Sequence, residues 1–353
     1  MRLTFRHAAL AAALAVLSTH ASAVSYFGSL SNFDVLNDTG SEKEGFEIEI
    51  HGVSSSDITY TFGGSYSRYG TPNITAFAGG VYVRYESAYD AALQQFLQRT
   101  PIAANLTPSG HDCYQGGPIG NYLGSGCEHF GVGLSKNATD VKYRWLDDDP
   151  ANPGQLVGSG VNVPIPAPVW QVQEPVQAGD PVVVRAEIEA PEIENEDLQK
   201  YGEAIWAKVV KTKTETPVLL EDLLSDDDMF DAAEVETEIE WKILQARAGR
   251  PEDGVLAIEN PVNANGKSIS YRYEFYRYTG GLTDEGEVEC LIDGCNEPGN
   301  GELGAYIGAQ MAALNLAAPV PEPETYALFG VGALFMAGRL RSTRRTTRAR
   351  LQA

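Results

Sequence analysis

Residues 234–243 read EVETEIEWKI, a strict alternation of charged and uncharged residues. A period of two is typical of a β-strand, because successive side chains point to opposite faces of the sheet. We therefore expect Val235, Ile239, Trp241 and Ile243 to face a core, while the glutamates share the solvent-facing side. Runs of similar character predict further strands at 46–51, 58–62, 81–85, 182–189, 204–213 and 270–278.

Strand patterns of this kind dominate the chain and predict an all-β, mainly antiparallel fold with a sandwich or jelly-roll-like architecture. Short helices are expected only at 88–99, 218–224 and 303–316. The chain is longer than one usual domain, and a proline-rich segment at 164–181 predicts a linker between an N-terminal β domain, 24–163, and a C-terminal one, 182–318. The alternative is a connection between two sheets of one large sandwich.

The N-terminus, residues 1–23, has the layout of a secretory signal. Arg2 and Arg6 precede an apolar run at 8–17, and Ala21-Ser22-Ala23 supplies a small-residue cleavage pattern. The apolar run is too short to cross a bilayer as a helix, so a permanent N-terminal anchor is the weaker interpretation. We expect the exported protein to begin near residue 24.

The C-terminus has three parts in a fixed order. Pro321-Glu322-Pro323 is followed by an apolar stretch at 326–338, and then by six arginines between 339 and 350. The stretch is short for a transmembrane helix, and basic residues beyond it are retained on the cytoplasmic side. This tail, residues 319–353, closely resembles the PEP-CTERM sorting signal, with Pro321, Glu322 and Pro323 as its motif.

That resemblance implies an address rather than an activity. It implies transient anchoring in the inner membrane of a Gram-negative bacterium and processing by an exosortase, with or without loss of the tail. It also implies delivery to the cell surface or extracellular matrix, where such proteins are associated with exopolysaccharide and biofilm. The segments 33–50 and 238–245 resemble parts of uncharacterised exported bacterial proteins, and they imply no site.

Four cysteines agree with export, because an even number of cysteines in a secreted chain is typical of disulfides. Their spacing predicts two local bridges, Cys113–Cys127 and Cys290–Cys295, each closing a glycine-rich loop. The sequence leaves the other two pairing schemes open.

The residues around the first bridge are nearly palindromic, with His111-Asp112 before Cys113 and Glu128-His129 after Cys127. Histidine and carboxylate side chains could bind zinc or copper, with His111, His129, Asp112 and Glu128 as the ligands. The favoured alternative is a disulfide with polar neighbours, in which case the sulfurs are not available as thiolates. Aspartate runs at 147–149 and 226–228 make calcium a further candidate ligand, although neither has the spacing of a calcium-binding loop.

The charge and the missing motifs exclude several classes of function. A formal net charge of −22 argues against a nucleic-acid partner. The sequence contains no nucleophile elbow, zinc-protease helix, phosphate loop or dinucleotide fingerprint. We therefore expect no catalytic activity and no cofactor, and a structural or interaction role in the matrix. The alternatives are a glycan-binding module, suggested by 17 Tyr and four Trp, and a metal-dependent or glycoside-acting enzyme.

Overall fold

The computed structural model describes residues 28–29, 33–104, 106, 108, 112–163, 165–173, 182–191, 193, 199–214, 235–250, 255–262, 268–289 and 296–315. All of them belong to one compact unit, Tyr26–Ala317. The predicted signal, the predicted sorting tail and the predicted helix at 218–224 lie outside the described residues. The described part contains no helix that is long and apolar enough to span a membrane.

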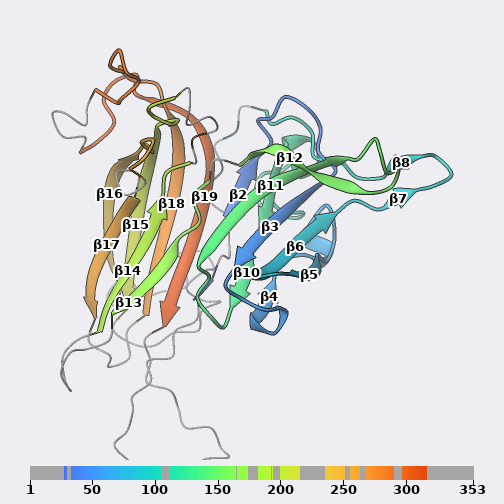
Figure 1. Ribbon diagram of the computed structural model, residues 1–353, viewed down its shortest axis with the longest axis horizontal. Coiled ribbons are helices and arrows are strands. Elements are labelled where there is room, and N and C mark those ends of the chain that lie inside the picture. Colours follow the sequence, from blue (N-terminus) through green and yellow to red (C-terminus); the bar gives the residue numbers. More distant parts are fainter. Residues whose placement is uncertain are drawn as a thin grey trace, which may run out of the picture. The chain divides into compact units, whose positions relative to one another are not determined.

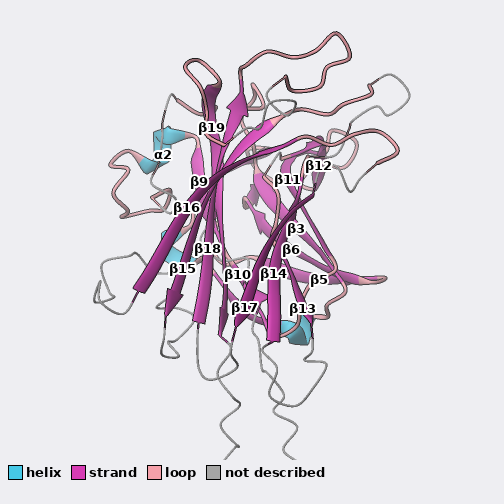
Figure 2. Cartoon of the chain, turned by 90° about the vertical axis from the view of Figure 1, so that its left-hand side faces the viewer, coloured by secondary structure: helices cyan, strands magenta, loops and turns pink. Residues whose placement is uncertain are grey.

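The regular structure of the described residues is mainly antiparallel β-sheet (Figures 1 and 2), which confirms the predicted fold class. The largest sheet has six strands in the order β16 (Val235–Leu244), β15 (Ile205–Thr214), β18 (Ser268–Tyr278), β19 (Leu303–Asn315), β2 (Phe33–Leu36) and β9 (Cys127–Phe130). A five-stranded sheet has the order β12 (Leu156–Asn162), β11 (Asp140–Asp148), β3 (Gly45–His51), β6 (Gly80–Glu86) and β5 (Asn73–Phe77).

Smaller sheets and short helices complete the described part. Two sheets have three strands, β13 (Val169–Gln173), β14 (Val182–Glu189) and β17 (Val255–Val262) in one, and β1 (Gly28–Ser29), β10 (Val132–Leu134) and β4 (Ile58–Thr61) in the other. The hairpin β7 (Tyr89–Asp90) and β8 (Gln95–Phe96) forms a two-stranded sheet. The helices are α2 (Tyr122–Ser125) and the 3-10 turns η1 (Ser55–Asp57) and η2 (Gly64–Tyr66).

An aromatic core joins the six-stranded sheet to the five-stranded one. The Phe46 ring of β3 stacks on Phe130 of β9 at 4.3 Å between centroids, and Trp145 of β11 meets it edge-on at 5.1 Å. Phe33 of β2 lies 4.7 Å from the ring of Tyr143. All five rings are buried, and such pairs each contribute about 0.5–1.5 kcal/mol beyond the burial of their area. This packing of sheet on sheet is the sandwich that the alternation predicts.

Most strand predictions are confirmed within a residue or two, including β3, β6, β14, β15 and β18. In β3 the apolar residues Phe46, Ile48 and Ile50 are fully buried, as the pattern predicts. The prediction for β16 is right about the strand and about the exposed side chain of Glu240, but wrong about a covered apolar side, because Ile239 is 60% exposed and Trp241 and Ile243 are only half-buried. The apolar side chains of β16 therefore do not face a buried core.

The helix expected at 88–99 is wrong, since this segment forms the β7–β8 hairpin. The Asp90 carboxylate accepts hydrogen bonds from the backbone amides of Ala92 and Leu93, at 2.8 and 3.1 Å, and so stabilises a turn. Gln94 then adopts a φ of 53°, in the left-handed region, which interrupts a right-handed helix.

The helix expected at 303–316 is also wrong, because these residues form β19. Their alanine, glutamine and methionine favour a helix intrinsically, but β19 lies between β18 and β2 and pairs with both. At Gly308 a Cβ would collide with the backbone oxygen of Asp34 and the side chain of Ile165. The close approach of β2 therefore requires glycine at this position.

Strands from both sides of the proline-rich segment share the six-stranded sheet, in which β2 precedes the segment and β19 follows it. Within the segment itself, Trp170 of β13 is buried against Tyr271 of β18, 5.5 Å between ring centroids, so this stretch is part of a sheet. The division into two domains stays a prediction, since shared pairing does not measure whether either half folds alone. Pro164 and residues 174–181 lie outside the described part.

Candidate functional site around the Cys113–Cys127 disulfide

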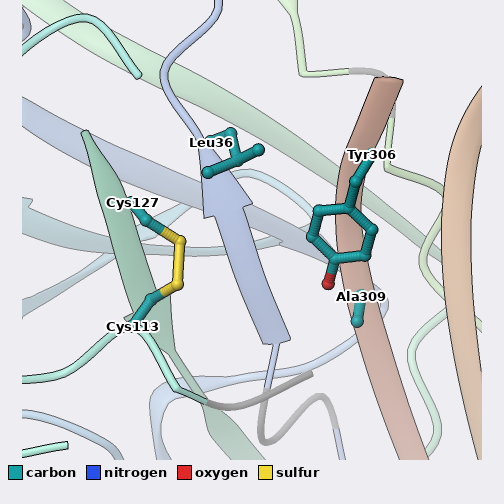
Figure 3. Packing of buried hydrophobic residues seen from close by; sticks show 5 residues of the cluster. All are labelled: Leu36, Cys113, Cys127, Tyr306 and Ala309. Carbon is teal, nitrogen blue, oxygen red and sulfur yellow. A yellow bond between two sulfur atoms is a disulfide. The ribbon is translucent and has the colours of Figure 1, made fainter. Parts of the chain in front are cut away.

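The disulfide Cys113–Cys127 is present as predicted, with its Cα atoms 5.4 Å apart. It packs in an apolar cluster with Leu36 of β2 and with Tyr306 and Ala309 of β19. Figure 3 shows the disulfide and the Tyr306 ring on either side of Leu36. The bridge therefore fixes the loop between its cysteines to the sheet. A disulfide that closes a loop of this length stabilises the folded protein by about 3 kcal/mol. Cys290 and Cys295 lie outside the described residues.

One polar pair lies on the same face of β9 as the disulfide. His129 is directly opposite Asp34 of β2, and its Nδ1 is 2.6 Å from the Asp34 carboxylate, with both side chains buried. The other Asp34 oxygen accepts a hydrogen bond from the backbone amide of Asp112 at 2.9 Å. The rings of Phe62 and Tyr114 meet the imidazole edge-on, at 4.5 and 6.0 Å. Asp34 thus links β2, β9 and the start of the disulfide loop.

The neighbouring residue Glu128 points to the opposite face, and its side chain is fully buried. One carboxylate oxygen accepts from Arg68 Nε at 2.5 Å and from Thr100 Oγ1 at 2.7 Å, and the other accepts from the Tyr122 hydroxyl. Burial raises the pKa of Glu128 above its usual value, although Arg68 and the hydrogen bonds oppose that effect. Burial, together with the Glu128 carboxylate, raises the pKa of the Tyr122 hydroxyl. This network ties α2 and the chain at Arg68 and Thr100 to β9.

Three of the four predicted metal ligands, Asp112, Glu128 and His129, are described by the structure, and these three do not form one group of ligand atoms. Glu128 and His129 are consecutive in a strand, so their side chains lie on opposite faces of the sheet. Asp112 contributes its backbone amide to Asp34, and His111 lies outside the described residues. A compact group of possible ligand atoms does occur at Asp34, Cys113 and Cys127, but its two sulfurs are bonded to each other. Zinc or copper binding on this loop stays a prediction.

The aspartate run at 147–149 has structural partners. Asp147 accepts from Lys43 Nζ at 2.6 Å, and the Asp149 carboxylate accepts from the amide of Ala151 and the side chain of Asn152. The second contact set holds the turn between β11 and β12. These hydrogen bonds keep the pKa of Asp149 below its usual value. The run at 226–228 lies outside the described residues, and calcium binding stays a prediction.

A family model described as the PEP-CTERM protein-sorting motif matches residues 319–345. The chain carries a PEP-CTERM sorting motif. This finding confirms the family resemblance read from Pro321, Glu322 and Pro323, and it marks an exported, cell-surface-targeted protein that an exosortase sorts. No curated protein and no solved structure matches the chain.

The PEP-CTERM motif begins close in sequence to β19, the last described strand. Strand β19 ends at Asn315, and only residues 316–318 separate it from the motif. Because β19 lies inside the six-stranded sheet, between β18 and β2, the sorting tail is joined to a central strand rather than to a peripheral loop.

Sequence reasoning found the disulfide and the sorting motif but missed Asp34, Arg68, Thr100 and Tyr122. None of these four belongs to a recognisable motif. Asp34, Arg68 and Thr100 lie 28–95 residues along the chain from the Glu128 or His129 side chain that they contact, and Tyr122 lies six residues from Glu128. Their role follows from strand register and loop packing. The one available signal was the alternation through residues 33–36, which places Asp34 and Leu36 on one face.

Proposed function

We propose that the protein is a non-catalytic component of the bacterial cell surface or extracellular matrix, associated there with exopolysaccharide. The observation that carries this proposal is the PEP-CTERM motif at 319–345, which residues 316–318 separate from the end of β19. The Cys113–Cys127 disulfide supports it, because such bonds persist in oxidising compartments. The buried charges beside that disulfide support it as well, because Glu128 and Asp34 are held by structural partners.

The proposal is tested by following the protein in the bacterium that produces it. Full-length protein and a triple variant, Pro321→Ala with Glu322→Ala and Pro323→Ala, are compared in cytoplasmic, membrane, outer-surface and matrix fractions of a biofilm. We expect the unaltered protein at the surface and in the matrix, and the triple variant retained in the membrane fraction. Intact mass of the recovered protein then reports whether the tail was removed. Recovery of unaltered protein only from the cell interior would contradict the proposal.

A role in the matrix is tested further by deleting the gene in the same bacterium. Deletion of the gene should reduce the amount or cohesion of the matrix, and a copy that carries the motif should restore it. A matched control is the triple variant, which leaves residues 24–318 unchanged and tests only delivery. Enzymatic turnover of matrix polysaccharide by the purified protein, or stoichiometric zinc, copper or calcium in its native mass, would favour the enzyme alternative instead.

A glycan-binding role is the second candidate. The observation that favours it is the apolar side of β16, which the structure leaves partly exposed.

A further inference from the structure

The six-stranded sheet carries an unusual combination of side chains on the outer side of β16, β15 and β18, three strands that run side by side in Figure 1. Residues directly opposite each other in antiparallel strands share a face. One row therefore places Trp241, Lys208 and Glu274 together, and the next row places Ile243, Trp206 and Tyr276 together. Aromatic rings and charged groups thus alternate over a small area of this face.

The rings in these rows form a supported cluster. Trp241 lies 5.7 Å from Tyr276 and 6.3 Å from Trp206, between ring centroids, and Tyr276 lies 5.4 Å from Tyr306. Trp206 and Tyr306 are buried, whereas Trp241 and Tyr276 are half-buried. The inner two rings therefore support the outer two, which keep part of their surface accessible. Ile239, 60% exposed, continues the apolar area along β16.

A carboxylate with several donors lies beside these rings. Glu274 is 3.1 Å from Lys208 Nζ and 3.2 Å from Arg272 Nε, and it accepts a hydrogen bond from the Tyr276 hydroxyl at 3.2 Å. Its side chain is 10% exposed, and that of Lys208 27%. Burial, with a contribution from Glu274, raises the pKa of Tyr276 to about 12, so its hydroxyl stays a neutral donor at physiological pH.

We propose that this outer face, centred on Trp241, Tyr276 and Glu274, binds a pyranose unit of a neutral polysaccharide. A sugar ring presents an apolar face of C–H groups and a rim of hydroxyls. The negative face of an aromatic ring attracts the C–H groups, while a carboxylate accepts from hydroxyls and an ammonium donates to them. Here both kinds of group lie within one cross-strand row of each other, as such a ligand requires.

Two features favour a sugar over a protein partner. The cores of protein interfaces are depleted in charged residues, whereas Lys208 and Glu274 lie in the middle of this face. The charges also lie beside half-buried rings rather than on a rim around a wide apolar patch. The inference rests on the proposed function only in the sense that a protein delivered to the matrix meets polysaccharide there.

The test is affinity electrophoresis of the disulfide-bonded protein in gels with and without polysaccharide. The probes are the polysaccharide purified from the matrix of the producing strain, hydroxyethyl cellulose as a neutral chain, and alginate as an acidic one. We expect retardation by at least one of the two first probes. Trp241→Ala should weaken it at least about tenfold, as loss of a central aromatic contact does, and Trp241→Phe should weaken it by less than about threefold.

Tyr82→Ala is the matched control, because Tyr82 is also half-buried and its ring lies 4.5 Å from that of Phe77, but on the outer face of the five-stranded sheet. It should leave retardation unchanged. Circular dichroism of each variant verifies folding. Three results would overturn the inference: none of the three probes retards the protein, only alginate retards it, or Trp241→Ala and Tyr82→Ala weaken the retardation equally. The fractionation of the unaltered protein decides the proposed function separately, since it does not involve Trp241.

Discussion

Strands β3 and β16 have nearly the same sequence pattern and opposite surroundings. In β3 the apolar residues face the aromatic core, and Glu47 and Glu49 lie on the other side. In β16 the apolar residues Ile239 and Trp241 lie on the partly exposed side. The difference follows from their positions, because β3 lies between β11 and β6 whereas β16 is an edge strand of its sheet. Alternation determines which residues share a face, and the tertiary structure determines which face is covered.

The glutamates of the two strands are partnered in different ways. Glu47 lies between Arg84 and Arg144, at 2.6 and 3.0 Å, so charges on three strands of the five-stranded sheet form one network. Glu238 of β16 lies 2.5 Å from Lys211 and 3.5 Å from Lys213, both of β15. In both strands, therefore, a glutamate on the side opposite the apolar residues forms cross-strand ion pairs, whereas the sequence predicted only a solvent-facing row of glutamates for β16.

The largest expected effect comes from the core side of β3. Phe46→Ala removes a ring that contacts Phe130 and Trp145, and such a truncation destabilises by about 3–5 kcal/mol. Ile239→Ala, the matched change on β16, should alter the free energy of unfolding by less than about 0.5 kcal/mol, because the side chain is already exposed. Denaturant unfolding measures both. Similar losses for the two variants would mean that β16 is covered in solution.

The buried carboxylate of β9 should rank next. Glu128→Gln keeps the shape of the side chain but leaves the buried Arg68 guanidinium without its counter-charge, which costs about 3 kcal/mol. Glu240→Gln, a change of an exposed side chain on β16, serves as the control and should be nearly neutral. If thermal unfolding shows equal midpoints for both variants, Arg68 and Glu128 do not form a buried pair.

Loss of the disulfide should follow. Cys113→Ala with Cys127→Ala releases a loop that covers Leu36 and Tyr306, with a loss of about 2–3 kcal/mol. Because the bridge packs on the six-stranded sheet, amide hydrogen exchange should accelerate in β19 and remain slow in β3. Reduction of the unaltered protein should reproduce the pattern. Uniform acceleration in both strands would argue that the bridge stabilises only through the unfolded chain.

The smallest expected effect is on the stability of the protein at acidic pH. Burial opposes ionisation of Glu49, but hydrogen bonds from His51 and Arg144 outweigh it and keep the pKa of Glu49 below its usual value. A lowered folded-state pKa stabilises the protein above the unfolded value of 4.5, and this stabilisation is lost as pH falls through the folded pKa. Glu49→Gln should therefore flatten the acid limb of a stability–pH curve below pH 4.5. If the stability of Glu49→Gln falls with pH as steeply as that of the unaltered protein, other carboxylates cause the loss of stability in acid.

The amino-acid sequence by itself determined the strand-rich fold and the sorting tail, because these depend on local alternation and on a contiguous motif. Its short cysteine spacing predicted the Cys113–Cys127 bridge, and the structure selected that pairing. The sequence wrongly predicted a helix in place of β19. Its alanines favour a helix, but pairing with β18 and β2 outweighs that preference. Only the tertiary structure placed Asp34 against His129 and Arg68 against Glu128, because those contacts join distant segments. It alone also showed that Trp241 and Tyr276 meet on a partly exposed face, since burial depends on which layers pack together and not on the order of residues along one strand.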